Sequence, residues 1–229
     1  GANNTAVGYA AGTAITTGGQ NTAVGSLSGD AITTGTNNTV LGYEAAGKLT
    51  TGTDNVAVGR AALLDTTTHS GNVAVGVESL ENNTADDNTG VGKHSLRANT
   101  TGSSNVGIGR DALLANTEGA GNTAIGAQAL DSNTTGGYSV AIGNRALQAV
   151  TTQGGIVAVG ADSMYSTTSG SNNVAVGSDS LKLNTTGYSN VGIGRNSLDA
   201  NTEGHSNTAV GESSLTSNTT GDRNVAIGQ

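Results

Sequence analysis

The sequence predicts an all-β protein, a parallel β-solenoid whose coils take 17 residues each. The segment Asn-[Thr/Val]-[Ala/Gly]-[Val/Ile]-Gly recurs along the chain, and twelve of its thirteen spacings are 17 residues, the other being 16. A period this short is typical of a solenoid coil, because helix-pair repeats run above about 30 residues. The 229 residues include 37 Gly but no Pro, Phe or Trp, which favours a thin aliphatic interior. We expect about 13 to 14 coils, with repeat glycines at 8, 25, 42, 59, 76, 92, 109, 126, 143, 160, 177, 194, 211 and 228.

The strand that precedes each glycine is the first element of a coil. Positions are counted from the repeat glycine, which is position 0. Position -3 is always Thr or Val and position -1 is always Val, Ile or Leu. Residues two apart in a strand share a face, so we expect both positions to point into the interior. The expected core residues at -1 are Val7, Val24, Val58, Val75, Ile108, Ile125, Ile142, Val176, Ile193, Val210 and Ile227.

Position -2 lies between these two and should therefore point outward. It is Ala or Gly in thirteen of fourteen coils, the exception being Val40. A line of small residues on an outer face indicates that another surface lies against it, and a second copy of the chain is the usual occupant. The alternative is that small residues only relieve crowding beside the turn. The expected interface between identical chains is Ala57, Ala74, Ala124, Ala141, Ala158, Ala175, Ala209 and Ala226.

After the glycine we expect an exposed corner at +1 and +2, a second strand and a second turn near +10. Position +4 is Leu or Met in ten coils, so the coil should be a flattened β-roll with Val and Ile on one wall and Leu and Thr on the other. The expected core leucines are Leu113, Leu130, Leu147, Leu181 and Leu198.

Two further columns refine this expectation. Position -4 is Asn in twelve of fourteen coils, and stacked Asn side chains can hydrogen-bond from coil to coil. The first three coils lack Leu at +4 and instead carry Ile15, Ile32 and Leu49 at +7, which keeps one large apolar group in each coil. We therefore expect a single repeat domain over 1–229, with a change of repeat subtype near residue 52.

The composition and motifs exclude several functions. The 17 acidic residues outweigh the 9 basic ones, and the net charge of -8 argues against nucleic-acid binding. No Cys and no long apolar run are present, so we expect no thiolate site and no membrane insertion in this segment. The three histidines fall at unrelated offsets, and neither a phosphate-binding loop nor a GGxGxD calcium motif occurs. We expect no enzyme activity, no catalytic residue, no metal and no cofactor.

The repeat carries a family resemblance. The segments NVAVG, NTAIG, SVAIG (139–143) and NVAIG resemble the head repeats of YadA-like trimeric autotransporter adhesins. The longer pattern NTAVGxxALxxNTTGxx is similar to arrays in phage tail-fibre and bacterial surface proteins. The resemblance implies a left-handed β-roll, three chains around one axis, and a location on a cell surface or virion. The chain begins and ends within the repeat, so we expect it to be a fragment of a longer fibrous protein. A role in attachment implies a host-cell surface or matrix receptor as partner.

We therefore expect a structural or adhesive segment of an extracellular attachment fibre. Residues 99–110 and 184–195 differ at one position and lie 85 residues apart, which is five coils, as whole-coil duplication would produce. One alternative is a self-assembling extracellular filament. Another is an ice-binding solenoid, because +8 is Thr in all thirteen complete coils, although +9 is interrupted by Ala85, Glu118, Ser169 and Glu203.

Overall fold

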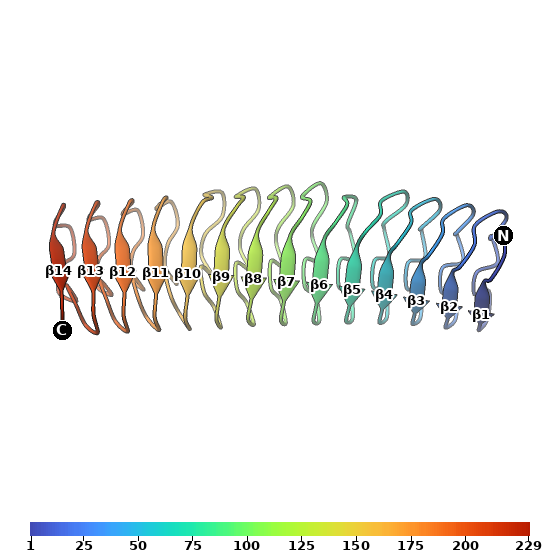
Figure 1. Ribbon diagram of the computed structural model, residues 1–229, viewed down its shortest axis with the longest axis horizontal. Helices are drawn as coiled ribbons and strands as arrows, with labels where there is room; N and C mark the ends of the chain where they lie inside the picture. The colour runs from blue at the N-terminus through green and yellow to red at the C-terminus, as the bar shows by residue number, and fades with distance from the viewer. The chain divides into compact units, whose positions relative to one another are not determined.

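Every repeat of the sequence forms one coil with one three-residue strand (Figure 1). The computed structural model describes residues 1–229 as two compact units, 1–118 and 119–229. The predicted parallel β-solenoid is confirmed: there are fourteen parallel strands and no helix. No helix is therefore available to cross a membrane.

Each unit contains seven strands in chain order. The first unit has β1 (Thr5–Val7), β2 (Thr22–Val24), β3 (Thr39–Leu41), β4 (Val56–Val58), β5 (Val73–Val75), β6 (Thr89–Val91) and β7 (Val106–Ile108). The second has β8 (Thr123–Ile125), β9 (Val140–Ile142), β10 (Val157–Val159), β11 (Val174–Val176), β12 (Val191–Ile193), β13 (Thr208–Val210) and β14 (Val225–Ile227).

Within a unit, consecutive strands pair in parallel, and each residue lies beside the residue at the same repeat position. In β4 and β5, for example, Ala57 lies opposite Ala74. The β-branched residues at -3 and -1 favour the extended backbone. Gly59 ends its strand with φ of 132°, and a Cβ there would lie 2.5 Å from the carbonyl oxygen of Gly76. The repeat glycine is therefore required by the close approach of neighbouring coils.

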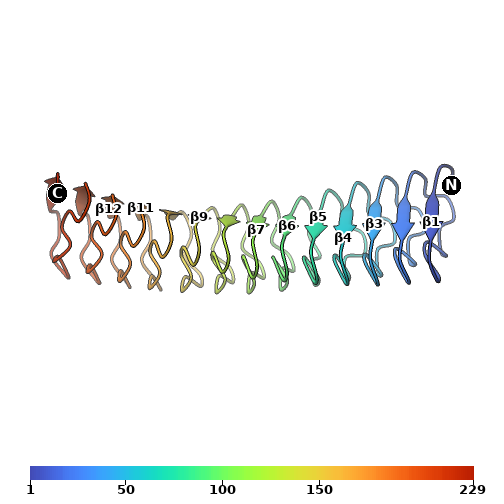
Figure 2. The same ribbon diagram turned by 90° about the horizontal axis from the view of Figure 1, so that it is seen from below.

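The wall opposite the strands contains no second strand, in contrast to the expectation from the sequence. It consists of turns, and Figure 2 shows the strands along one wall with the turn segments opposite. Positions +2 and +4 take positive φ, as at Glu78 (56°) and Leu80 (51°), which interrupts an extended chain. Hydrogen bonds still join this wall from coil to coil: Leu63 N–H donates to Ser79 O at 3.0 Å, and Asp65 N–H donates to Glu81 O at 2.8 Å.

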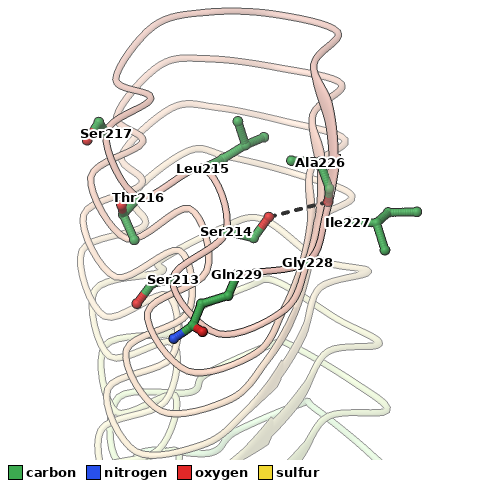
Figure 3. Close-up of a pocket in the computed structure, with 9 residues that line it drawn as sticks. All are labelled: Ser213, Ser214, Leu215, Thr216, Ser217, Ala226, Ile227, Gly228 and Gln229. Atoms are coloured by element: carbon green, nitrogen blue, oxygen red, sulfur yellow. Dashed lines mark hydrogen bonds between the residues drawn. The ribbon is translucent and has the colours of Figure 1, made fainter.

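The side chains of each strand point in the opposite directions to those expected from the sequence. The expected core residues at -1 are half-exposed or exposed in the chain, with Val7 at 58% and Ile193 at 40%. The expected interface alanines point inward and are fully buried, except Ala226 in the last coil, which is half-buried. Figure 3 shows this reversal in the last coil, where Ala226 points inward and Ile227 points away. The sequence-based assignment of the two faces was therefore wrong. The residues at -1 that were expected inside lie outside: Val7, Val24, Val58, Val75, Ile108, Ile125, Ile142, Val176, Ile193, Val210 and Ile227. The residues at -2 that were expected outside lie inside: Ala57, Ala74, Ala124, Ala141, Ala158, Ala175, Ala209 and Ala226.

The narrowness of the coil explains the reversal. Leu113, Leu130, Leu147, Leu181 and Leu198 are fully buried and fill the space that faces the strand. At Gly90, an added Cβ would lie 2.6 Å from Ser79 Oγ and 3.2 Å from Leu80 Cγ. Only a small side chain at -2 fits opposite such a leucine, so the larger Val and Ile must take the outer face.

The first three coils lack Leu at +4, and a residue at +7 fills the space instead. Gly29 replaces Leu at +4, and the side chain of Ile32 occupies that space, since a Cβ on Gly29 would lie 2.8 Å from Ile32 Cδ1. Ile32 and Leu49 are fully buried. Val40, the one large residue at -2, is also fully buried and follows the coil that lacks Leu. Interior volume is therefore kept nearly constant from coil to coil.

Candidate interaction surfaces

One candidate interaction surface is the outward side of the strands, where apolar residues recur in every coil. We call the residues at -3 and -1 the outer strand face. Its side chains are Val, Ile, Leu or Thr in every coil, and no charged residue lies among them. Five residues at -1 are each at least 36% exposed, although further coils precede and follow theirs along the chain: Ile108, Ile125, Ile142, Val176 and Ile193. Apolar residues that recur in every coil of one outer face make that face a candidate interaction surface.

A charged cluster lies at the corner of the first unit, where position +2 of successive coils stacks. His94 lies between two carboxylates: Nε2 is 3.2 Å from Glu78 Oε2, and Nδ1 is 3.1 Å from Asp111 Oδ1. Glu78 also pairs with Arg60, and with Arg97 at 3.4 Å. The hydrogen bond from Arg60 lowers the pKa of Glu78, and Arg97 and His94 act in the same direction against partial burial. Acid–base groups here are paired with one another, which stabilises the stack of coils.

The second unit has an equivalent corner. Arg145 donates to Asp162 at 2.7 Å and its guanidinium lies 5.2 Å from the Tyr165 ring. Lys182 Nζ donates to Asp179 Oδ1 at 2.6 Å. This bond lowers the pKa of Asp179 and raises that of Lys182. Coil stacking brings Arg145 to Asp162, one coil apart, whereas Lys182 and Asp179 lie in the same coil.

One aromatic pair lies at position -6 of neighbouring coils. The rings of Tyr188 and His205 stack with centroids 4.7 Å apart and an angle of 11°. His205 Nδ1 is 2.7 Å from Asp222 Oδ1, at position -6 of the next coil. The three residues lie at one repeat position, so the 17-residue offset brings them together.

A hollow of about 300 Å³ opens at the end of the second unit (Figure 3). Its lining runs along the last strand and the facing turn, from Ser213 to Ser217 and from Ala226 to Gln229. Ser214 Oγ donates to Ala226 O at 3.3 Å, and Leu215 points inward. The lining has hydroxyl, amide and aliphatic groups but no ionisable side chain.

The histidines are not brought together by the fold. His94 and His205 have separate carboxylate partners, and His69 lies at +10 of its own coil. No group of three or more His, Asp or Glu side chains has the geometry to hold a metal ion.

The threonines at +8 form a ladder, although they are surface residues and not inward ones. Thr33 Oγ1 donates to Thr50 O at 3.2 Å, and Thr100 Oγ1 donates to Thr117 O at 2.9 Å. Position +9 also lies at the surface, because this part of the coil is a turn. Because Glu118 and Glu203 interrupt position +9, the two positions form no regular double rank of hydroxyls. At +8, the hydroxyls of Thr33 and Thr100 already donate within the chain.

Comparison with protein-family models, curated proteins and solved structures finds no match to this chain. A function for this chain must therefore be inferred from its own surfaces. Sequence reasoning missed the corner clusters, although reading position +2 down the coils would have found Glu78, His94 and Asp111 in consecutive repeats.

Proposed function

We propose that this chain is a structural segment of an extracellular attachment fibre, in which identical chains lie side by side through the outer strand face. The resemblance of the repeats to adhesin heads and tail fibres suggests three chains. The observation that supports the proposal is the column of partly or fully exposed Val, Ile and Leu side chains at -1, which recurs in every coil of each unit.

The outer strand face suits a partner that repeats at the same interval. Its side chains recur once per coil, at the strand spacing of about 4.8 Å. Burying a half-exposed Val or Ile contributes about 1 kcal/mol, and seven coils in a unit multiply that gain. A second copy of the chain has the matching period by construction, and identical chains usually associate through symmetric contacts.

The repeat also suits a segment whose length sets reach. Each coil is joined to the next by backbone ladders, so coils can be added or removed as whole units. Segments 99–110 and 184–195 are nearly identical across five coils, which is consistent with that mode of growth. The variable residues at +1 and +2 are the surface on which a receptor contact would lie, since the other columns serve the interior, the turns or the outer strand face.

A deletion of five coils tests the proposal in the cell or virion that displays the fibre. Removing 110–194 joins Gly109 to Arg195 and restores the sequence NVGIGR at the junction. A spacing role predicts shorter reach with unchanged receptor specificity, whereas an adhesive head predicts avidity that falls with the number of coils. Attachment that is indifferent to the deletion would contradict both roles.

A further inference from the structure

Each coil is joined to the next along the turn at positions +8 to +10, which we call the threonine edge. We call the passage from one coil to the next a step. In a regular step, the N–H groups of this turn donate to one carbonyl oxygen of the next coil. At Thr168, Ser169 and Gly170, for example, these N–H groups lie 3.0 to 3.2 Å from the same acceptor, Thr185 O. The hydroxyl of Thr168 donates to that oxygen as well, at 3.2 Å, and strengthens the contact between the two coils.

The step that follows Gln153 is open along the threonine edge. No N–H group from 151 to 153 donates to Thr168 O, which is the equivalent carbonyl oxygen. The hydroxyl of Thr151 does not donate to it either, although the hydroxyl of Thr134 donates to Thr151 O at 2.9 Å one coil earlier. The threonine edge is therefore bonded before this step and after it, and open at the step itself.

A Cβ atom at position +10 explains the opening. This position is Gly in most coils, and Gly170 there does not take positive φ, so the requirement for Gly comes from space. A Cβ on Gly170 would lie 2.3 Å from Gly187 O, the carbonyl oxygen at +10 of the next coil. Gln153 has a Cβ at the equivalent place, opposite Gly170. Because the two atoms cannot share that space, the coils separate along this edge.

Two interior columns are interrupted at the same step. Position -4 is Ile156, which has no side-chain oxygen to accept the buried N–H of Asn173 in the next coil. Position +7 is Val150, and the hydroxyl of Thr167, at +7 of the next coil, is buried without a hydrogen-bond partner. The side-chain oxygen of Gln153 is likewise buried without a partner. The Asn ladders of the interior therefore do not cross this step.

The other two sides of the coil remain joined. Strands β10 and β11 lie side by side (Figure 1) and pair in register, with Ala158 opposite Ala175. On the leucine side, the N–H of Leu147 donates to Ser163 O at 3.1 Å. The two coils are therefore held along the strands and the leucine wall and released along the threonine edge, which is the arrangement of a hinge.

The first unit has a second opening, at His69, which also occupies position +10. No N–H group from 67 to 69 donates to the next coil along the threonine edge, and His69 Nδ1 is buried without a partner. Strands β4 and β5 again remain paired. His69 and Gln153 are the two residues other than Gly at +10 of a 17-residue coil, and each stands at an open step. The coil after His69 has only 16 residues, so Gln153 is the clearer case.

We propose that the step after Gln153 is a hinge, at which the threonine edge opens while the strands stay paired, and that His69 marks its counterpart in the first unit. A hinge of this kind lets a stack of coils bend without the unfolding of any coil. The inference goes beyond the proposed function, because it depends on contacts within one chain and not on any partner.

Spin labels on both sides of the step test the hinge in the intact chain, which has no native cysteine. The exposed pair Thr135→Cys/Ser169→Cys spans two steps, and the second of these follows Gln153. The exposed pair Ser169→Cys/Glu203→Cys is the matched control, since it spans two steps whose threonine edge is bonded. Electron paramagnetic resonance should give a longer and broader distance distribution for the first pair, and adding Gln153→Gly should bring it to that of the control. Labelled chain is diluted with unlabelled chain, so that only distances within one chain are measured.

Hydrogen exchange is a second measurement. The amide hydrogens of 151–153 should exchange about tenfold faster than those of 168–170, and Gln153→Gly should remove the difference. The amides of β10 should remain as protected as those of β11, because a hinge leaves the strands paired.

Equal distance distributions for the two label pairs, or equal exchange at the two turns, would overturn the inference. Fast exchange throughout β10 would show that the two coils separate completely, which also contradicts a hinge. A broad distribution that persists in Gln153→Gly would contradict the assignment of the opening to the Cβ of this residue.

Discussion

The side-chain oxygen of Asn38 accepts both N–H donors of Asn55, which lies one coil further along the chain. The backbone N of Asn55 and its Nδ2 are each 3.1 Å from Asn38 Oδ1. Asn55 Nδ2 also donates to His69 O at 3.0 Å. Both residues are fully buried, and the same pattern joins Asn21 to Asn38. The interior of these coils is therefore a satisfied polar ladder beside a leucine column.

Asn55→Ala should destabilise the first unit by about 2–3 kcal/mol, because it leaves His69 O without its side-chain donor and the buried backbone N–H of Asn72 without its acceptor, Asn55 Oδ1. Asn37→Gly is the matched control: Asn37 is exposed and has φ of 58°, which Gly accommodates. Chemical denaturation of the two variants measures the difference. Equal stability would show that the buried ladder contributes nothing measurable.

Gly90→Ala tests the fit between the strand and the facing turn. The added methyl would approach Ser79 Oγ, which donates to Gly90 O at 3.0 Å, and we expect a loss of about 1 kcal/mol. The double variant Ser79→Ala/Gly90→Ala should recover most of it, because Ala62 and Ala74 form that pair one coil earlier. A double-mutant cycle measures the coupling, and strictly additive effects would contradict the proposed contact.

Glu78 should make the first unit sensitive to acid. Its folded pKa lies below its ordinary value of 4.5, chiefly because Arg60 donates to it, so the carboxylate stabilises the fold above that value and loses this contribution as the pH falls. Glu78→Gln should flatten the fall in melting temperature between about pH 6 and about pH 3. Asp179, whose pKa is lowered by Lys182, should act in the same direction in the second unit. An unchanged pH profile in both Glu78→Gln and Asp179→Asn would contradict this account.

Ala141→Lys and Ile142→Lys place the same charge on opposite sides of one strand. Ala141 is fully buried, so its replacement should disrupt the coils of the second unit. Ile142 is 36% exposed and belongs to the outer strand face, so its replacement should leave the isolated chain folded. Circular dichroism and thermal melting distinguish them. Equal melting of the two variants would show that the strand orientation is wrong.

The repeat period, the parallel register and the stacking of Asn at -4 could all be predicted from the sequence. They depend on which residues recur at one interval, and a one-dimensional pattern contains that information. The period of two shows that Val56 and Val58 share a face of the strand, but it does not show which face is inside. That choice depends on the space left by Leu80 and Ser79 across a narrow coil, which only the three-dimensional packing reveals.

The second strand was wrongly expected for a different reason. Glu78 and Leu80 take positive φ, although neither is a residue type that favours it. Hydrogen bonds between coils hold this backbone in place: Glu78 N–H donates to Arg60 O and Leu80 N–H to Ser95 O, each at 3.0 Å. A local sequence preference therefore predicted a strand where the stacked coils impose a turn.

The mass of the wild-type chain in solution, measured by light scattering beside that of Ile142→Lys, tests the central claim most directly. The account predicts a wild-type mass that is a multiple of 22.2 kDa, three times that value for the proposed trimer, and a folded Ile142→Lys chain near 22.2 kDa. A wild-type mass of 22.2 kDa at every concentration would contradict the claim that the outer strand face joins identical chains.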